Sequence, residues 1–136
     1  MISNTSNGQN TSSLQLDNTE WTMFKESDGI QIMYRYEECN DDVNGIHDGY
    51  ILFKFVNTTS SNLMVQWKDM IWYDNVCKTC NIASDEYRHH ILLAANETKE
   101  GNCSNNLKLF RKHLGTSSQP TELTGFDMSE FKVVLR

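Results

Sequence analysis

The stretch from Gly49 to Cys80 constrains the fold more than any other part of the chain. It contains two long apolar-rich runs, Tyr50–Val56 and Leu63–Tyr73, and the polar segment Asn57–Asn62 separates them. Both runs are dominated by β-branched and aromatic residues, a composition that fits a pleated, half-buried strand. Two such runs around a short polar segment are typical of antiparallel strands joined by a longer loop. The sequence therefore predicts a β-hairpin at the centre of the fold.

The order of residues within each run predicts which face is buried, because successive side chains of a strand point to opposite faces. Asp69 is the only charged residue on the apolar face of the second run. We expect this face of each strand to pack against a core and the other face to tolerate water. The predicted core residues are Ile51, Phe53 and Phe55 in the first run and Leu63, Val65, Trp67 and Ile71 in the second.

Shorter runs on both sides of this region predict further strands. Turn residues separate them, and no amphipathic helix is evident, so the sequence indicates seven to eight short strands in an all-β fold. The long, uneven loops favour an antiparallel β-sandwich over a barrel. Residues 1–18 are polar and almost uncharged, so we expect a flexible leader there and a single β-sandwich domain over residues 19–136. The additional strands are predicted at Trp21–Phe24, Ile30–Glu38, Tyr87–Ala94, Leu107–Leu114, Leu123–Met128 and Phe131–Leu135.

Two segments resemble, in their layout, parts of the immunoglobulin-like sandwich modules of secreted proteins. In those modules a strand ending in Asn-Thr leads into a turn, as Phe55-Val56-Asn57-Thr58 does here. A Leu-x-x-Asn-Glu-Thr-like segment then precedes a later strand, as in Leu93-Ala94-Ala95-Asn96-Glu97-Thr98. The resemblance implies an immunoglobulin-like shape for the predicted sandwich.

The four cysteines are Cys39, Cys77, Cys80 and Cys103. An even number in a β-rich chain favours two structural disulfides, and four cysteines allow three fully paired connectivities. We prefer Cys39–Cys77 with Cys80–Cys103, which would tie the ends of two strands to the loop between them. A four-cysteine zinc site and a thiol-redox motif at Cys77-Lys78-Thr79-Cys80 are the alternatives.

Several features bear on where the protein acts. No run approaches the roughly 20 apolar residues of a membrane-spanning helix, and the first 18 residues lack the basic start and apolar core of a signal peptide. The chain is therefore either cytosolic or the mature form of an exported protein whose signal was replaced by a starting Met. The cysteines favour a secreted, periplasmic or cell-surface protein. Asn-x-Ser/Thr triplets suit a secreted eukaryotic protein, although a chain rich in these residues also produces them by chance; they begin at Asn4, Asn10, Asn57, Asn96 and Asn102.

Charge and motifs narrow the classes of function. With 12 lysines and arginines against 18 acidic residues the formal charge is −6 at pH 7, and the basic residues are scattered, so nucleic acid is not an expected partner. There is no nucleophile elbow, no glycine-rich phosphate loop and no His-Glu-x-x-His zinc motif. The acidic loop Asn40–Gly45 lacks the spaced ligands and closing Glu of an EF-hand. His89 and His90 are neighbours on a predicted strand, so they face opposite ways and cannot ligate one ion.

We therefore expect no catalytic residues, no metal and no cofactor, and a non-enzymatic module that binds a protein or carbohydrate ligand outside the cytoplasm. A carbohydrate-active enzyme is an alternative, which would require two carboxylates facing each other across a groove.

The predicted binding residues are Trp72, Tyr73 and Asp74. Trp72 falls on the face opposite Trp67, and Tyr73 and Asp74 follow it at the strand end. An exposed Trp beside Tyr and Asp is a plausible stacking platform for a sugar ring or a partner side chain. The alternative is that Trp72 packs under a neighbouring loop, or in the core if a bulge at Asp69 shifts the alternation.

Overall fold

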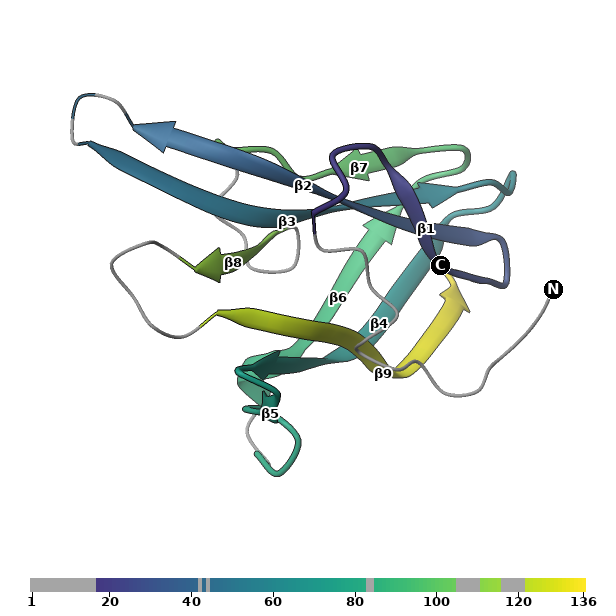
Figure 1. Ribbon diagram of the computed structural model, residues 1–136. Helices are drawn as coiled ribbons and strands as arrows, with labels where there is room; N and C mark the ends of the chain where they lie inside the picture. The colour runs from purple at the N-terminus through teal and green to yellow at the C-terminus, as the bar shows by residue number, and fades with distance from the viewer. Residues whose placement is uncertain (1–16, 42, 44, 83–84, 105–110, 116–121) are drawn as a thin grey trace, which may run out of the picture.

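The computed structural model describes residues 17–136 apart from 42, 44, 83–84, 105–110 and 116–121 (Figure 1). The expected leader over residues 1–18 therefore lies almost entirely outside the described residues. Within them the chain forms nine strands and one 3-10 turn, η2 (Asp85–Tyr87). The strands are β1 (Thr22–Ser27), β2 (Ile30–Asp41), β3 (Ile46–Asn57), β4 (Leu63–Tyr73), β5 (Val76–Cys77), β6 (Arg88–Leu93), β7 (Thr98–Glu100), β8 (Arg111–Gly115) and β9 (Leu123–Leu135).

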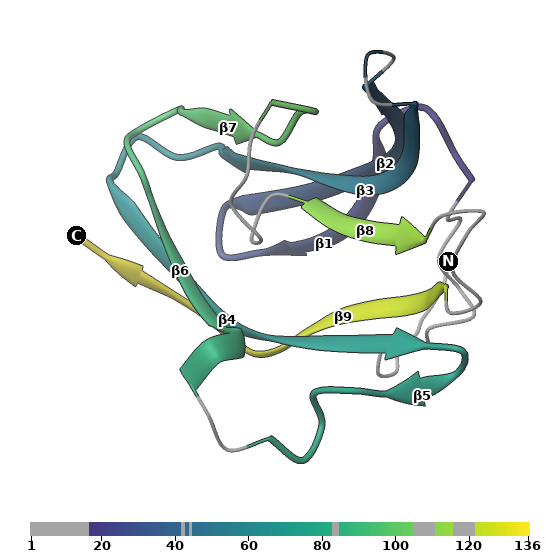
Figure 2. The same ribbon diagram turned by 90° about the vertical axis from the view of Figure 1, so that its left-hand side faces the viewer.

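The strands form two antiparallel sheets that pack face to face, so the predicted all-β sandwich is confirmed. In the first sheet the order is β1-β2-β3-β7, and β8 also pairs with β3. In the second sheet the order is β5-β4-β6, and β9 pairs with β4. Figure 2 shows the two layers edge on, with β2, β3 and β8 in one and β4, β9 and β5 in the other.

The predicted central hairpin is wrong, because β3 and β4 lie in different sheets. β3 pairs with β2 along its whole length, and β4 pairs with β6 and β9. The segment between them crosses from one layer to the other. This arrangement places the apolar faces of both strands opposite each other, where Phe55 stacks on Trp67 with ring centroids 5.1 Å apart. Crossing the layers therefore buries both faces in one core.

Asn57 holds this crossing in place. Its side chain is 1% exposed, and Nδ2 donates hydrogen bonds to the carbonyls of Ser61, Leu93 and Ala94 at 2.8, 3.2 and 3.0 Å. The backbone N–H of Asn57 also donates to the Glu97 carbonyl at 2.9 Å, so the end of β3 lies beside the segment that follows β6. A buried amide with three acceptors cannot carry a glycan in the folded state. The triplet at Asn57 is therefore excluded as a glycosylation site.

The core lies between the two sheets and confirms the predicted faces. Every predicted core residue of the two central runs is buried, and so is Asp69. Aromatic rings fill the centre: Phe53 lies 4.7 Å from Phe126 and 6.4 Å from Phe24 between ring centroids. The buried apolar residues are Phe24, Ile30, Ile32, Tyr34, Ile51, Leu52, Phe53, Phe55, Leu63, Val65, Trp67, Ile71, Ile91, Leu93, Leu123, Phe126 and Met128.

The remaining strand predictions agree in outline. The runs Leu123–Met128 and Phe131–Leu135 form one strand, β9, which carries a register shift where Gln66 and Lys68 of β4 pair with Lys132 and Ser129. Glu130 has a φ of 52° there, as expected of a β-bulge that admits an extra residue. Of the predicted strand Leu107–Leu114, residues 107–110 lie outside the described part of the chain, and β8 begins at Arg111. The very short β5 and β7 were not predicted.

Candidate functional site

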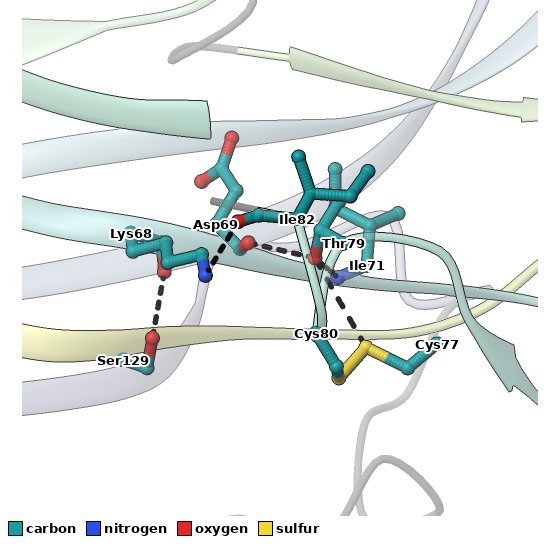
Figure 3. The surroundings of a disulfide bond; sticks show 8 residues. All are labelled: Lys68, Asp69, Ile71, Cys77, Thr79, Cys80, Ile82 and Ser129. Atoms are coloured by element: carbon teal, nitrogen blue, oxygen red, sulfur yellow. Dashed lines mark hydrogen bonds between the residues drawn. A yellow bond between two sulfur atoms is a disulfide. The ribbon is translucent and has the colours of Figure 1, made fainter. Parts of the chain in front are cut away.

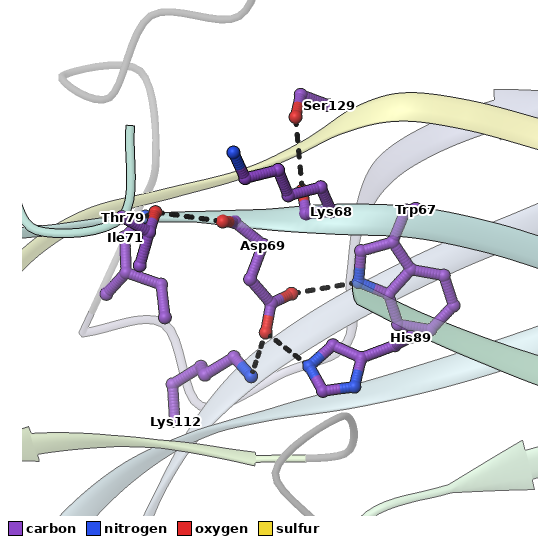
Figure 4. Close-up of polar contacts among 8 residues, drawn as sticks. All are labelled: Trp67, Lys68, Asp69, Ile71, Thr79, His89, Lys112 and Ser129. Carbon is purple, nitrogen blue, oxygen red and sulfur yellow. Dashed lines mark hydrogen bonds and ion pairs between the residues drawn. The ribbon is translucent and has the colours of Figure 1, made fainter. Parts of the chain in front are cut away.

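Asp69 lies in the middle of β4 and points into the core, where its side chain is 2% exposed (Figure 4). Three donors surround it. Lys112 Nζ of β8 lies 2.7 Å from Oδ2, His89 Nε2 of β6 lies 2.8 Å from the same oxygen, and Trp67 Nε1 donates to Oδ1 at 2.8 Å. We call Trp67, Asp69, His89 and Lys112 the Asp69 cluster. Because Lys112 comes from the opposite sheet, the cluster joins the two layers by a buried ion pair.

The surroundings of Asp69 set its charge. Burial alone would raise the pKa of this carboxyl, but the hydrogen bond from His89 and the positive charge of Lys112 outweigh it, so the pKa lies below its ordinary value. Asp69 is therefore ionised at neutral pH. A buried ion needs this degree of pairing, because an uncompensated charge in a low-dielectric interior is very costly.

The loop after β5 closes one side of this cluster (Figure 3). Thr79 is buried, its hydroxyl donates to the Asp69 carbonyl at 2.9 Å, and it accepts from the Ile71 N–H at 3.1 Å. The N–H of Lys78 donates to the Ile71 carbonyl at 2.8 Å. A disulfide between Cys77 and Cys80 encloses Lys78 and Thr79 in a short ring. The ring therefore fixes the backbone of Lys78 against β4.

The structure confirms two disulfides but not the expected pairing. Cys39 bonds to Cys103, and Cys77 bonds to Cys80. Cys39 lies on β2, and Cys103 follows the segment in which the Gly101 N–H donates to the Phe53 carbonyl of β3, so both belong to the first sheet. Cys77 and Cys80 are on the second. The predicted pairs would have linked opposite layers, and sequence spacing alone does not tell which layer a cysteine joins.

The two bridges should differ in their effect on stability. The loop closed by Cys39–Cys103 spans 64 residues and that closed by Cys77–Cys80 spans 3. Loop-closure entropy then predicts that replacing Cys39 and Cys103 by Ser costs about 3 kcal/mol more than replacing Cys77 and Cys80. Urea unfolding of the two double variants measures the difference, and non-reducing peptide mapping of the unaltered protein checks the pairs. A peptide joining Cys39 to Cys77 would contradict both the pairing and the expected order.

A pocket of about 390 Å³ opens beside the Asp69 cluster. Its walls come from both layers, with β3 and β8 on one side and β4, the Cys77–Cys80 ring and η2 on the other. We call this the interlayer pocket. It is lined by Tyr50, Asp69, Ile71, Tyr73, Lys78, Thr79, Tyr87, Arg111, Lys112 and His113.

Cationic side chains outnumber acidic ones in this lining. Asp69 is the only carboxylate among the described lining residues, whereas Lys78, Arg111 and Lys112 are cations. Arg111 is held in place: its guanidinium carbon lies 4.4 Å from the centroid of the Tyr50 ring, and Nη1 donates to the Cys103 carbonyl at 3.1 Å. The pocket is therefore locally basic in a protein of formal charge −6.

Three tyrosines supply the aromatic surface of the pocket. The Tyr73 hydroxyl donates to the His113 carbonyl at 2.8 Å and ties β4 to β8. Burial raises the pKa of Tyr73, and the neighbouring Tyr87 raises it further. Burial and then the adjacent Glu86 raise the pKa of Tyr87. Both hydroxyls are therefore neutral donors at physiological pH.

The three predicted binding residues do not share one surface. Tyr73 lines the interlayer pocket. Trp72 is half-buried on the outer face of β4, where it pairs with Cys77 of β5 and Gly125 of β9. Asp74 is exposed in the turn after β4, with a φ of 51°, and its Oδ1 accepts from the Glu122 N–H at 3.2 Å. The structure thus brings Tyr73 together with residues that sequence reasoning missed, most of them distant in the chain.

The geometry also bears on the alternative chemistries. All four cysteine sulfurs are bonded in pairs, so a four-cysteine zinc site would require breaking both bridges. Glu37 lies close to the sulfurs of Cys39 and Cys103, but disulfide sulfurs are not the thiolates that bind zinc. In the interlayer pocket Asp69 faces no second carboxylate among the described lining residues, so the arrangement of a glycosidase is not met there.

Among the described residues, no helix has the length and apolar character needed to cross a bilayer. No protein-family model, curated protein or solved structure matches this chain.

Proposed function

We propose that this protein is a non-enzymatic binding module of immunoglobulin-like shape that acts outside the cytoplasm, and that the interlayer pocket is its recognition site. The observation that carries the proposal is the pocket itself. It has the volume of a small-ligand site and combines aromatic walls with a few fixed polar groups, as ligand sites do. Two disulfides are compatible with an oxidising compartment, which supports a location outside the cytoplasm.

The proposal is non-enzymatic because the one carboxylate among the described lining residues of the pocket is engaged in holding the fold. The carboxylate of Asp69 is paired with Lys112 and His89 and is hydrogen-bonded to Trp67. General acid–base catalysis requires a group that can exchange its proton with a substrate. Asp69, ionised at neutral pH and fully paired, instead fixes the walls of the pocket, and a preformed pocket lowers the cost of ordering on binding.

Titration of the isotope-labelled protein with a panel of monosaccharides and short peptides, followed by NMR, tests the proposal. We expect the amide signals that shift to cluster at the pocket, above all those of Ile71, Tyr73 and Lys78. Tyr87→Ala should weaken binding because it removes an aromatic wall. His90→Ala should not, because His90 is exposed on β6 and does not line this pocket. Shifts that cluster elsewhere, or conversion of a ligand into product during the titration, would contradict the proposal.

A further inference from the structure

We infer that the interlayer pocket selects a small organic anion, a six-membered ring that carries a carboxylate. The inference rests on the proposed function and specifies its ligand. Two sources offer this chemistry, acidic sugars such as hexuronic acids and aromatic carboxylic acids. The argument comes from the charges of the pocket, from how those charges are held and from the shape of the walls between them.

The charge of the pocket favours an anion. Asp69 is engaged by Lys112 and His89, so its negative charge is compensated inside the cluster. Lys78 is exposed at the wall, and within the described residues its ammonium forms no ion pair. Arg111 adds a second positive charge on the facing sheet. An acidic protein that gathers cations around one pocket attracts anions to that pocket and repels them elsewhere.

The two cations approach from opposite layers. The Cys77–Cys80 ring and the bond from the Lys78 N–H to Ile71 fix the backbone of Lys78. Arg111 is fixed by its contact with the Tyr50 ring and by its bond to the Cys103 carbonyl. Its guanidinium thus contributes a fixed positive charge that faces the ammonium of Lys78 across the pocket, and a carboxylate answers both charges.

The walls between the cations suit a ring. Tyr50, Tyr73 and Tyr87 present aromatic surface, with Ile71 beside them. Flat rings pack well on tyrosine, and its hydroxyl adds a polar contact for a ring substituent. A volume of about 390 Å³ admits a single ring with its substituents but is near the lower end for larger ligands.

Matched ligand pairs test the charge requirement. We would titrate the intact protein with glucuronate against glucose, and with benzoate against benzyl alcohol, and follow the pocket signals by NMR. Each anion is expected to bind about fivefold more tightly than its neutral partner, the upper end of the effect of a partly exposed charge pair. Added salt should reduce this preference, because exposed charges are screened. A larger preference for glucuronate over glucose would indicate an acidic sugar as the ligand, and a larger preference for benzoate over benzyl alcohol would indicate an aromatic carboxylic acid.

A matched pair of variants tests the residue. Lys78→Met should weaken anion binding about fivefold and leave the neutral ligands unchanged. Lys132→Met removes an exposed lysine of β9 that does not line the pocket, and it should change neither. Both are surface substitutions, so thermal unfolding should confirm intact folds.

Three outcomes would overturn the inference: equal binding of charged and neutral partners, Lys78→Met without effect on anions, and no binding of either anion. Neutral ligands that bind in the pocket while anions do not would overturn the inference and leave the proposed function standing. Ligands that shift only signals outside the pocket would overturn both.

Discussion

Replacing Asp69 by Asn is expected to destabilise the domain by about 3–5 kcal/mol, because it leaves the ammonium of Lys112 buried without its counter-charge. The side chain of Lys112 is only 6% exposed, so water replaces the lost partner incompletely. Urea unfolding at neutral pH measures the loss. Asp28→Asn is the matched control: Asp28 is exposed in a turn with a φ of 52°, which Asn adopts readily, so its change should stay within about 0.5 kcal/mol.

The double variant Asp69→Asn with Lys112→Met separates the ion pair from the rest of the site. If the penalty of the single variant comes from the ammonium left without Asp69, the double variant should lose less stability than the sum of the two single variants.

Acid unfolding gives a second measure of the same ion pair. The folded pKa of Asp69 lies below its ordinary value of 3.8, so its contribution is complete above that value and is lost as the pH falls through the folded pKa. The difference in the free energy of unfolding between the unaltered protein and Asp69→Asn should therefore become smaller in that pH range. Additive losses in the double variant, together with a difference that does not change with pH, would contradict this account.

Trp67→Ala should have an effect of similar size. Trp67 is 2% exposed, stacks on Phe55 from the opposite layer and donates to Asp69, so its removal opens a large cavity and leaves a carboxylate oxygen without a donor. Losses of about 3–5 kcal/mol are typical of large core aromatics. Trp72→Ala on the same strand is the comparison. Trp72 is half-buried on the outer face, so we expect about 1 kcal/mol. Equal losses in urea unfolding would show that Trp72 belongs to a packed interior as well.

The alternation of side chains along a strand explains why much of the fold could be predicted from the sequence. Alternation is a local property with a period of two residues, so it identified the buried faces around Phe53 and Val65 without any knowledge of the partners of each strand. Sheet membership is not local. The hairpin expected across Asn57–Asn62 failed for this reason, since it assumed that neighbours in the sequence are neighbours in a sheet. The preferred cysteine pairs failed because each joined a strand end of one layer to a loop of the other.

The site was only partly visible in the sequence for a related reason. Asp69 was the single charge on an apolar face, which is a sequence signal for a buried carboxylate with partners. Its partners His89 and Lys112 are 20 and 43 residues away, and no pattern of spacing links them to Asp69. The sequence predicts Trp72, Tyr73 and Asp74 as one binding surface, although alternation along the strand places Trp72 and Tyr73 on opposite faces. A stricter use of alternation would have separated the two.

The path of the chain between the two layers has a consequence for how the protein is made. The first three strands belong to one layer and the next three to the other; β7 and β8 then return to the first, and β9 returns to the second. β9 pairs with β4 from Leu63 to Tyr73, so that central strand lacks one neighbour until the last strand is available. A nascent chain emerging from the ribosome therefore cannot complete the second layer until β9 is synthesised. Folding that waits for such distant pairings is slow and exposes apolar strands in the meantime, so assistance from chaperones should matter more here than in a protein of similar size built from local hairpins.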